Sequence, residues 1–324
     1  MKIFLIFCLA ILASCSSAFK KSDTFVEDSE FLKQGHKIED YEEEVVEEPK
    51  DEKPKTEVGK EKKPHPKKEI VKDIKKKVED TVVKGKKAEK PSGFPFKVGE
   101  EVTLSATFFG VEAGKILIGV DKFKKFAGKK QYHFYAFGKT SSVFSMFYKV
   151  KNKIETLWDP ELKKPSSLAF DVVETKQKYK IRVYFDWLKK QGEYLEEGWA
   201  KKKGDYRVQK KWTLEEKAQD IVSAAFYMRT FPLKVGKEYK LTVMEEDKII
   251  DVHFKVDRKE VLKTRVGKFD TLVLKPRFST KGKFKQVGDI SVWLTDDSYR
   301  QVVRIESKIK IGTVVAKLHS LKRP

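Results

Sequence analysis

The sequence predicts an all-β fold, in which one large curved antiparallel meander forms an open or partly closed barrel with a single short covering helix. Two observations lead to this prediction. From Phe96 onward, apolar and polar residues alternate with a period of two, and turn residues interrupt the alternation about every ten positions. Only one segment of this region has helical spacing. About twelve strands in one meander cannot stay flat, so the sheet must curl or fold on itself.

The segment from Lys178 to Trp187 is the clearest strand. Its odd-numbered residues, beginning with Tyr179, are apolar or aromatic, and charged residues dominate the alternate positions. One dry and one wet face favour antiparallel pairing over a buried parallel sheet. The other expected strands are Val102–Phe108, Lys115–Val120, Gln131–Phe137, Phe144–Trp158, Glu193–Ala200, Glu238–Met244, Ile250–Val256, Val261–Val266, Thr271–Pro276, Gly288–Leu294, Val302–Ile311 and Thr313–Leu318.

The expected helix spans Asp220–Arg229. Ile221, Ala224, Ala225 and Met228 follow the i, i+3, i+4, i+7 spacing of a helix with one apolar face. Pro232 ends it, and we expect this helix to cover one end or mouth of the curled sheet.

The first fifteen residues predict export and a lipid anchor. Lys2 precedes an apolar run, Ile3–Ala13, that is too short to span a bilayer but suits a signal peptide. The run ends in Leu12–Cys15, which resembles a bacterial lipobox, and this resemblance implies cleavage before Cys15 and its acylation. The alternative is an ordinary secretory signal. By resemblance to enterobacterial lipoproteins, Ser16 implies anchoring in the outer membrane, and we expect the protein to face the periplasm.

Residues 15–95 predict a disordered tether between the signal peptide, residues 1–14, and the β domain, residues 96–324. Asp23–Glu52 is acidic and Lys53–Lys90 is basic. Low hydrophobicity and blocks of charge cannot offset the entropy lost on ordering, although Glu69–Val83 could form a short helix. About 80 coil residues would reach roughly 50 Å.

The β domain carries nearly all of the net charge of +21. In an exported protein nucleic acid is not the expected partner. We expect an anionic lipid, lipopolysaccharide, a cell-wall polymer or an envelope protein instead, and the alternative is a merely solvated basic surface. Cys8 would leave with the signal peptide, so the mature chain would have no disulfide and no cysteine metal site.

Several motifs of the β domain resemble a family of exported bacterial proteins known only as domain-of-unknown-function family 3108. The resemblance implies this fold and compartment but no activity, and its sheet-plus-helix pattern is similar in outline to the open barrels of periplasmic lipoprotein carriers. One departure is Gln301, where the family pattern has a proline. The resembling segments are Gly110 with Ala113–Gly114, Asp220–Arg229, Pro232–Leu233 with Gly236, Gly267–Thr271, Pro276, Val292–Asp297 and Gly312–Leu318.

The carboxylates and histidines give weak signals for catalysis. Asp296 and Asp297, with Asp289 nearby, could bind a cation or act as acid and base, but the same residues are ordinary turn formers. His133 and His253 fall on the polar side of their strands, so we expect them to be exposed. Nucleophile elbows and phosphate-binding glycine loops are missing from the sequence, so we expect no enzyme, no metal site and no cofactor.

Aromatic residues exceed what one alternating face needs. Phe109, Phe147, Tyr184, Trp199 and Trp212 are the candidate ligand-binding residues, which could line an apolar cavity for an acyl chain. The alternative is that both faces of a curled sheet form core.

Three functions follow. The leading hypothesis is an outer-membrane lipoprotein whose basic β domain binds an anionic envelope component or a partner protein without catalysis. The second is a carrier or chaperone for acyl lipids or lipoproteins, with the helix as a lid over an apolar cavity. The third is a glycan or cell-wall hydrolase, which requires two of Asp220, Asp289 and Asp296 to converge at roughly 5–10 Å.

Overall fold

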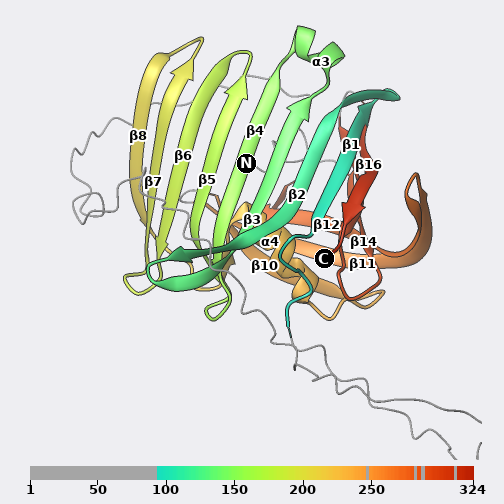
Figure 1. Cartoon of the computed structure of the whole chain (residues 1–324). Helices are drawn as coiled ribbons and strands as arrows, with labels where there is room; N and C mark the ends of the chain where they lie inside the picture. The colour runs from blue at the N-terminus through green and yellow to red at the C-terminus, as the bar shows by residue number, and fades with distance from the viewer. Residues whose placement is uncertain (1–92, 246–247, 281–282, 286–288, 310–311) are drawn as a thin grey trace, which may run out of the picture. The chain divides into compact units, whose positions relative to one another are not determined.

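A computed structural model describes residues 93–324, except 246–247, 281–282, 286–288 and 310–311 (Figure 1). The predicted signal peptide, the predicted lipidation of Cys15 and the predicted tether up to residue 92 lie outside the described residues. Residues from Pro95 to Pro324 belong to one compact unit, whose fold is described here.

The described strands form one sheet in which every neighbouring pair is antiparallel except β9 and β10. The order along the sheet is β8-β7-β6-β5-β4-β3-β2-β1-β16-β15-β14-β12-β11-β10-β9, with β13 paired to β12. The strands are β1 (Glu101–Phe108), β2 (Val111–Phe126), β3 (Lys129–Thr140), β4 (Val150–Asp159), β5 (Lys164–Glu174), β6 (Gln177–Asp186), β7 (Gln191–Ala200), β8 (Gly204–Thr213), β9 (Ala218–Gln219), β10 (Glu238–Glu245), β11 (Lys248–Thr264), β12 (Gly267–Thr280), β13 (Lys283–Lys285), β14 (Asp289–Thr295), β15 (Val302–Ile309) and β16 (Gly312–Lys322).

This sheet is curved and open, which confirms the predicted fold class. β8 and β9 stand at the two ends of the strand order and do not pair with each other. Figure 1 shows β3 to β8 side by side in one curved layer, with the helix α4 (Ile221–Tyr227) next to β10. A short 3-10 helix, η1 (Met228–Thr230), continues α4. Another helix, α3 (Ser142–Phe147), connects β3 to β4, and we call the edge formed by these strand ends the α3 end of the sheet. None of the described helices is long and apolar enough to cross a bilayer.

Several elements depart from the sequence prediction. The short strands β9 and β13 were not predicted, and the predicted strands Ile250–Val256 and Val261–Val266 form one strand, β11. β5 was not predicted because both of its faces carry apolar residues, which hides the alternation. β8 was not predicted because Lys210 stands where an apolar residue would mark the dry face. The predicted strand Phe144–Trp158 begins only at Val150, and its first residues belong to α3 instead.

Local hydrogen bonds explain why α3 forms. The Ser141 side chain accepts from the Phe144 N–H at 3.4 Å and so caps the first turn. The Ser145 hydroxyl donates to the Ser142 carbonyl at 2.7 Å. Serine side chains compete in this way with strand pairing, and a period-two pattern does not reveal the competition.

The predicted helix, α4, packs on the concave face of the sheet. Phe226 stacks on Phe134 of β3 with ring centroids 4.1 Å apart. The Trp158 indole N–H donates to Gln219 at 3.1 Å, just before the helix. On its other side Ala224 joins an apolar cluster from the C-terminal strands. The buried members of that cluster include Leu241, Val243, Phe254, Val256, Leu272, Leu274 and Leu294. The helix therefore fills the space inside the curl.

Candidate functional site

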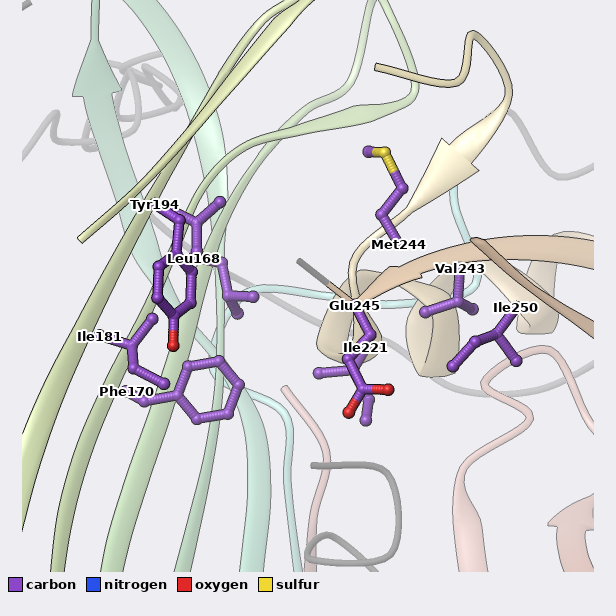
Figure 2. Close-up of a pocket in the computed structure, with 10 residues that line it drawn as sticks. Leu168, Phe170, Ile181, Tyr194, Ile221, Val243, Met244, Glu245 and Ile250 are labelled. Atoms are coloured by element: carbon purple, nitrogen blue, oxygen red, sulfur yellow. The ribbon is translucent and has the colours of Figure 1, made fainter. Parts of the chain in front are cut away.

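An apolar cleft lies on the concave face, where the two ends of the open sheet approach α4 (Figure 2). It is open to solvent, and the space that a water-sized sphere can occupy in it is only about 30 Å³. One wall comes from β5 to β7 and the other from α4, β10 and β11. The lining residues are Leu168, Phe170, Ile181, Val183 and Tyr194 on the first wall and Ile221, Val243, Met244, Glu245 and Ile250 on the second.

Strand register explains the first wall. Leu168 lies directly opposite Val183, and Val183 lies opposite Tyr194, so these side chains share one face of the sheet. Glu245 is the one carboxylate of the lining. The lining is therefore apolar apart from one carboxylate.

Two glutamates on the face of the sheet that carries Leu168 and Val183 each accept hydrogen bonds from two or more side chains. Glu196 accepts from the Tyr194 hydroxyl at 2.5 Å and from the Tyr206 hydroxyl at 2.8 Å. Glu174 accepts from Tyr148 and from Gln177, both at 2.8 Å. Burial, followed by these carboxylates, raises the pKa of Tyr206 and Tyr148 above the usual range. The phenols stay neutral and act as donors.

Asp220 caps α4 rather than facing a substrate. One of its oxygens accepts from the N–H groups of Val222 and Ser223, at 2.7 and 2.9 Å, and from the Thr156 hydroxyl at 3.1 Å. The Ser223 hydroxyl oxygen accepts from the Asp220 N–H in return, which completes a capping box. Desolvation raises the pKa of this fully buried carboxyl to about 6, against the effect of these hydrogen bonds.

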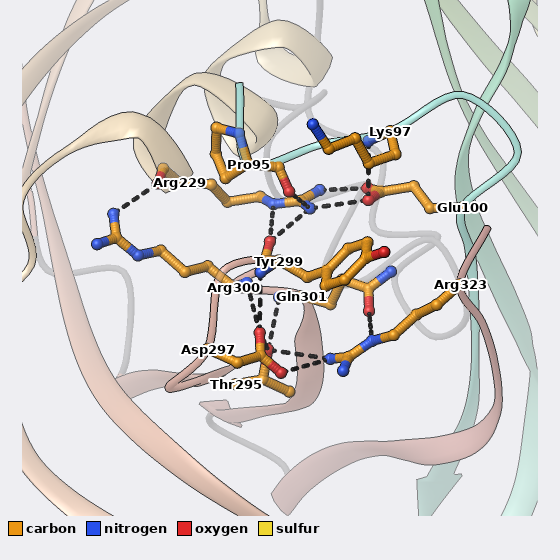
Figure 3. A network of polar contacts seen from close by, with 10 residues as sticks. All are labelled: Pro95, Lys97, Glu100, Arg229, Thr295, Asp297, Tyr299, Arg300, Gln301 and Arg323. Atoms are coloured by element: carbon orange, nitrogen blue, oxygen red, sulfur yellow. Dashed lines mark hydrogen bonds and ion pairs between the residues drawn. The ribbon is translucent and has the colours of Figure 1, made fainter. Parts of the chain in front are cut away.

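Asp297 shapes the turn between β14 and β15 (Figure 3). It accepts from the N–H groups of Tyr299 and Arg300, at 2.9 and 3.0 Å, and pairs with Arg323 at 2.7 Å. Burial acts to raise the pKa of Asp297, but hydrogen bonds from Thr295 and Arg300 and the Arg323 charge outweigh it and lower the pKa.

The remaining candidate carboxylates have other surroundings. Asp296 pairs with Lys259 at 2.6 Å, and Asp289 is exposed at the start of β14. These partners favour the turn and cap roles of the predicted carboxylates over acid–base roles.

Beside the turn between β14 and β15 lies a buried ion pair that was not predicted from the sequence. Arg229 of η1 is 4% exposed and Glu100 is 2% exposed. The guanidinium donates to the two Glu100 oxygens at 2.5 and 3.1 Å, and to the carbonyls of Pro95 and Tyr299. We call this cluster the arginine clasp, because it joins the start of the domain, the end of α4 and the β14–β15 turn (Figure 3).

A model of the family described as "Protein of unknown function (DUF3108)" matches residues 101–319. The chain belongs to the DUF3108 family. The resemblance seen in the sequence motifs is thereby confirmed, and the arginine clasp uses Arg229, which lies in one of those motifs. None of the curated proteins compared with this chain matches it.

Three crystal structures are similar to this DUF3108 chain over 71% of its length. One is a β-barrel-like protein of the DUF1849 family from Brucella abortus, 11% identical, with 99% of that chain covered and a TM-score of 0.45. The second, a candidate exported protein with a YmcC-like fold from Bacteroides fragilis, is 12% identical, with 98% covered and a TM-score of 0.27. The third, a candidate lipoprotein from Parabacteroides distasonis, is 10% identical, with 97% covered and a TM-score of 0.27.

The expected exposure of His133 is wrong. This side chain is buried in the DUF3108 domain, with its ring nitrogens 2.9 Å from Glu155 and 3.3 Å from Asp121. Burial opposes ionisation of Glu155, yet hydrogen bonds from His133 and Lys153 lower its pKa to about 2. His253 is partly exposed, 3.5 Å from Glu238. The described part of the chain holds no group of three His, Cys, Asp or Glu side chains arranged for a metal ion.

The five aromatic candidates do not line the described cleft. Tyr184 is buried on the opposite face of β6, where Phe126 stacks on it. Trp212 lies against Gly192 on the neighbouring strand. Trp199, Phe109 and Phe147 are 44, 75 and 80% exposed. Sequence alternation identified apolar positions here, but it could not show which face of the sheet becomes concave.

One of these aromatics, Phe147, belongs to an exposed apolar cluster at the α3 end of the sheet. Phe109, in the turn between β1 and β2, instead has its ring close to Gly312 of β16. The Ser141 N–H and hydroxyl donate to the carbonyls of Ala113 and Glu112, so α3 is attached to the start of β2. We call the cluster the α3 patch. Its members are Val111, Val143, Met146 and Phe147.

Proposed function

We propose that this DUF3108 protein is a non-catalytic lipoprotein of the bacterial cell envelope, whose basic β domain binds an anionic lipid surface. A row of lysines across the sheet carries the proposal. Lys115, Lys139 and Lys151 lie directly opposite one another on β2, β3 and β4. Val173 of β5 follows, and then Lys178 of β6. We call the four lysines, all of them exposed, the lysine row.

The neighbouring row of the same face shows what a balanced arrangement looks like. There Lys153 lies opposite Asp171, Asp171 opposite Lys180, and Lys180 opposite Glu197. Side chains in directly opposite positions have Cβ atoms about 5 Å apart, so like charges there destabilise a sheet. The lysine row therefore carries a repulsion that a layer of anionic head groups would neutralise.

The position of the row suits a flat partner. Lys139, Lys151 and Lys178 are each one residue from the end of their strand at the α3 end of the sheet. A lysine near an anionic membrane surface contributes about 1 kcal/mol, so four lysines give about 4 kcal/mol at low salt. This interaction needs no catalytic group, in keeping with the structural partners of Asp220, Asp296 and Asp297.

Vesicle binding tests the proposal. The mature chain without its predicted lipid anchor, residues 16–324, is mixed with phosphatidylcholine vesicles that hold 0 or 30% phosphatidylglycerol. We expect binding only to the anionic vesicles, a steep loss with salt, and a loss of about 30-fold or more in Lys139→Glu/Lys151→Glu. The matched control is Lys234→Glu/Lys255→Glu, in the C-terminal half. Equal binding to neutral vesicles, or an equal loss in the control, would refute the proposal.

The apolar lining of the cleft favours a second candidate function, the binding of an acyl chain, for which the two walls of the cleft would have to separate. Native mass spectrometry of the protein purified from cells, followed by lipid extraction, would reveal a bound lipid. Ile221→Phe fills the cleft without adding a charge, so it should abolish lipid binding, whereas Ile221→Val should preserve it. An empty wild-type protein would count against this function and leave the lysine row untouched.

A further inference from the structure

The side chains of the α3 patch are large, apolar and mostly exposed to solvent. Met146 and Phe147 are 76 and 80% exposed, and Val111 and Val143 are also more than half exposed. Single exposed apolar side chains are common, but a group of large ones on adjoining segments marks an interaction site.

The helix α3 is built to present this surface. Val143, Met146 and Phe147 have i, i+3, i+4 spacing, which places them on one face of the helix. None of the residues of α3 is buried. Phe144, outside this set, packs against a buried core cluster that includes Ala113 of β2, and so fixes the helix. The helix therefore has an anchoring side and an exposed apolar side.

The turn between β1 and β2 presents Phe109 in an unusual backbone conformation. Phe109 has φ of 48° and Gly110 has φ of 79°. Two-residue hairpin turns with two positive φ angles favour Asn-Gly or Asp-Gly, and a bulky residue in the first position is strained. The Phe109 ring packs against Phe108, with ring centroids 4.4 Å apart, and lies close to Gly312, so this residue stands outside the α3 patch.

We infer that the α3 patch inserts into the interfacial layer of a lipid bilayer while the lysine row binds the head groups behind it. This inference rests on the proposed function, and it adds a hydrophobic contact to an electrostatic one. Charge favours a bilayer over a second copy of the chain, because two copies meeting at this end would bring their lysine rows together. Interfacial segments of this kind bury apolar side chains about 5–10 Å deep.

The inference predicts two separable components of vesicle binding. Insertion buries apolar area and persists in high salt, whereas the lysine contribution is screened. With the mature chain on vesicles containing 30% phosphatidylglycerol, we expect Met146→Ser/Phe147→Ser to weaken binding in 0.5 M salt by about 100-fold, taking roughly tenfold for each large apolar side chain.

The opposite end of the sheet supplies a matched control. Leu188 is 98% exposed and Leu162 is 48% exposed, in the turns after β6 and β4. Leu162→Ser/Leu188→Ser removes the same number of large apolar groups and should leave the salt-resistant component unchanged. Because all four side chains are exposed, the thermal unfolding midpoints of both variants should stay within a few degrees of wild type.

A fluorescent label reports insertion directly. The mature chain from Ser16 has no cysteine, so Met146→Cys and Leu188→Cys accept a single environment-sensitive probe each. We expect a blue shift and quenching by lipid-borne quenchers at position 146 only. A probe that stays in water while the protein still binds at low salt would overturn insertion and leave the lysine row standing. Absence of binding even at low salt would overturn both, and a dimer that Met146→Ser/Phe147→Ser dissociates would assign the patch to self-association instead.

Discussion

Replacing Arg229 with methionine should be among the most destabilising single changes in the domain. The substitution removes a buried charge that bonds both oxygens of Glu100 and the carbonyls of Pro95 and Tyr299. Methionine fills much of the same volume, so the dominant loss is electrostatic. The Glu100 carboxylate, 2% exposed, would remain buried without its counter-charge.

The magnitude follows from that unpaired charge. Breaking a buried ion pair by removing one partner costs about 3–5 kcal/mol. For a domain of this size each kcal/mol lowers the thermal midpoint by about 2–4 °C, so we expect a decrease of roughly 6–20 °C. Glu100→Gln in the same background removes the stranded charge and should restore at least 2 kcal/mol.

Urea unfolding of the four proteins in this cycle measures the coupling. Wild type, Arg229→Met, Glu100→Gln and the double variant are compared through the free energy of unfolding and the slope of its dependence on urea. Strict additivity of the two changes, or a loss below 1 kcal/mol in Arg229→Met, would show that the arginine clasp does not hold these three segments together.

Three further changes test other parts of the structure. The folded-state pKa of Asp220 is raised from 3.8 to about 6, so its protonated form adds stability that is complete below pH 3.8 and is lost as the pH rises through 6. The free energy of unfolding of wild type, relative to that of Asp220→Asn, should therefore fall by about 3 kcal/mol between pH 3.5 and pH 7. A difference that does not change with pH would refute the argument that burial raises this pKa. In Gly198→Ala the added Cβ would meet the Lys178 carbonyl oxygen, whereas in Gly192→Ala it would meet the Trp212 ring. Because backbone atoms move less readily than a side chain, the free energy of unfolding in urea should fall by at least about 1 kcal/mol more in Gly198→Ala than in Gly192→Ala. Lys139→Glu alone should stabilise the domain by up to about 1 kcal/mol at low salt, because it turns two repulsive cross-strand pairs into attractive ones, and no gain would contradict the account of the lysine row.

The sequence predicted correctly those elements that are determined by residues close to one another in the chain. The apolar spacing and the proline stop predicted α4, and the residue that caps it, Asp220, stood at the predicted start. The ordinary turn reading of Asp297 also agrees with the structure. Each of these depends on residues within a few positions of one another, so no knowledge of the remaining chain was needed.

The missed features depend on which face of the sheet turns inward. His133 lies on the face opposite the concave one, yet it is buried because Asp121 and Glu155 enclose it from β2 and β4. The residues that line the cleft, such as Leu168, are spaced along their strands as core residues are, so the sequence does not distinguish them from the core. The lysine row appears only once strand register is known, because its members are separated by 12 to 27 positions in the chain.

The pairing of β1 with β16 has a consequence for how the chain acquires its structure. Glu101 is paired with Lys322, so the centre of the sheet joins the first strand to the last. Successive hairpins from β1 to β8 can form as the chain emerges, but the edge of β1 that faces β16 stays unpaired until β16 has been made. Contacts between such distant positions are slow to form. The middle of this sheet is therefore the part of the domain that is completed last.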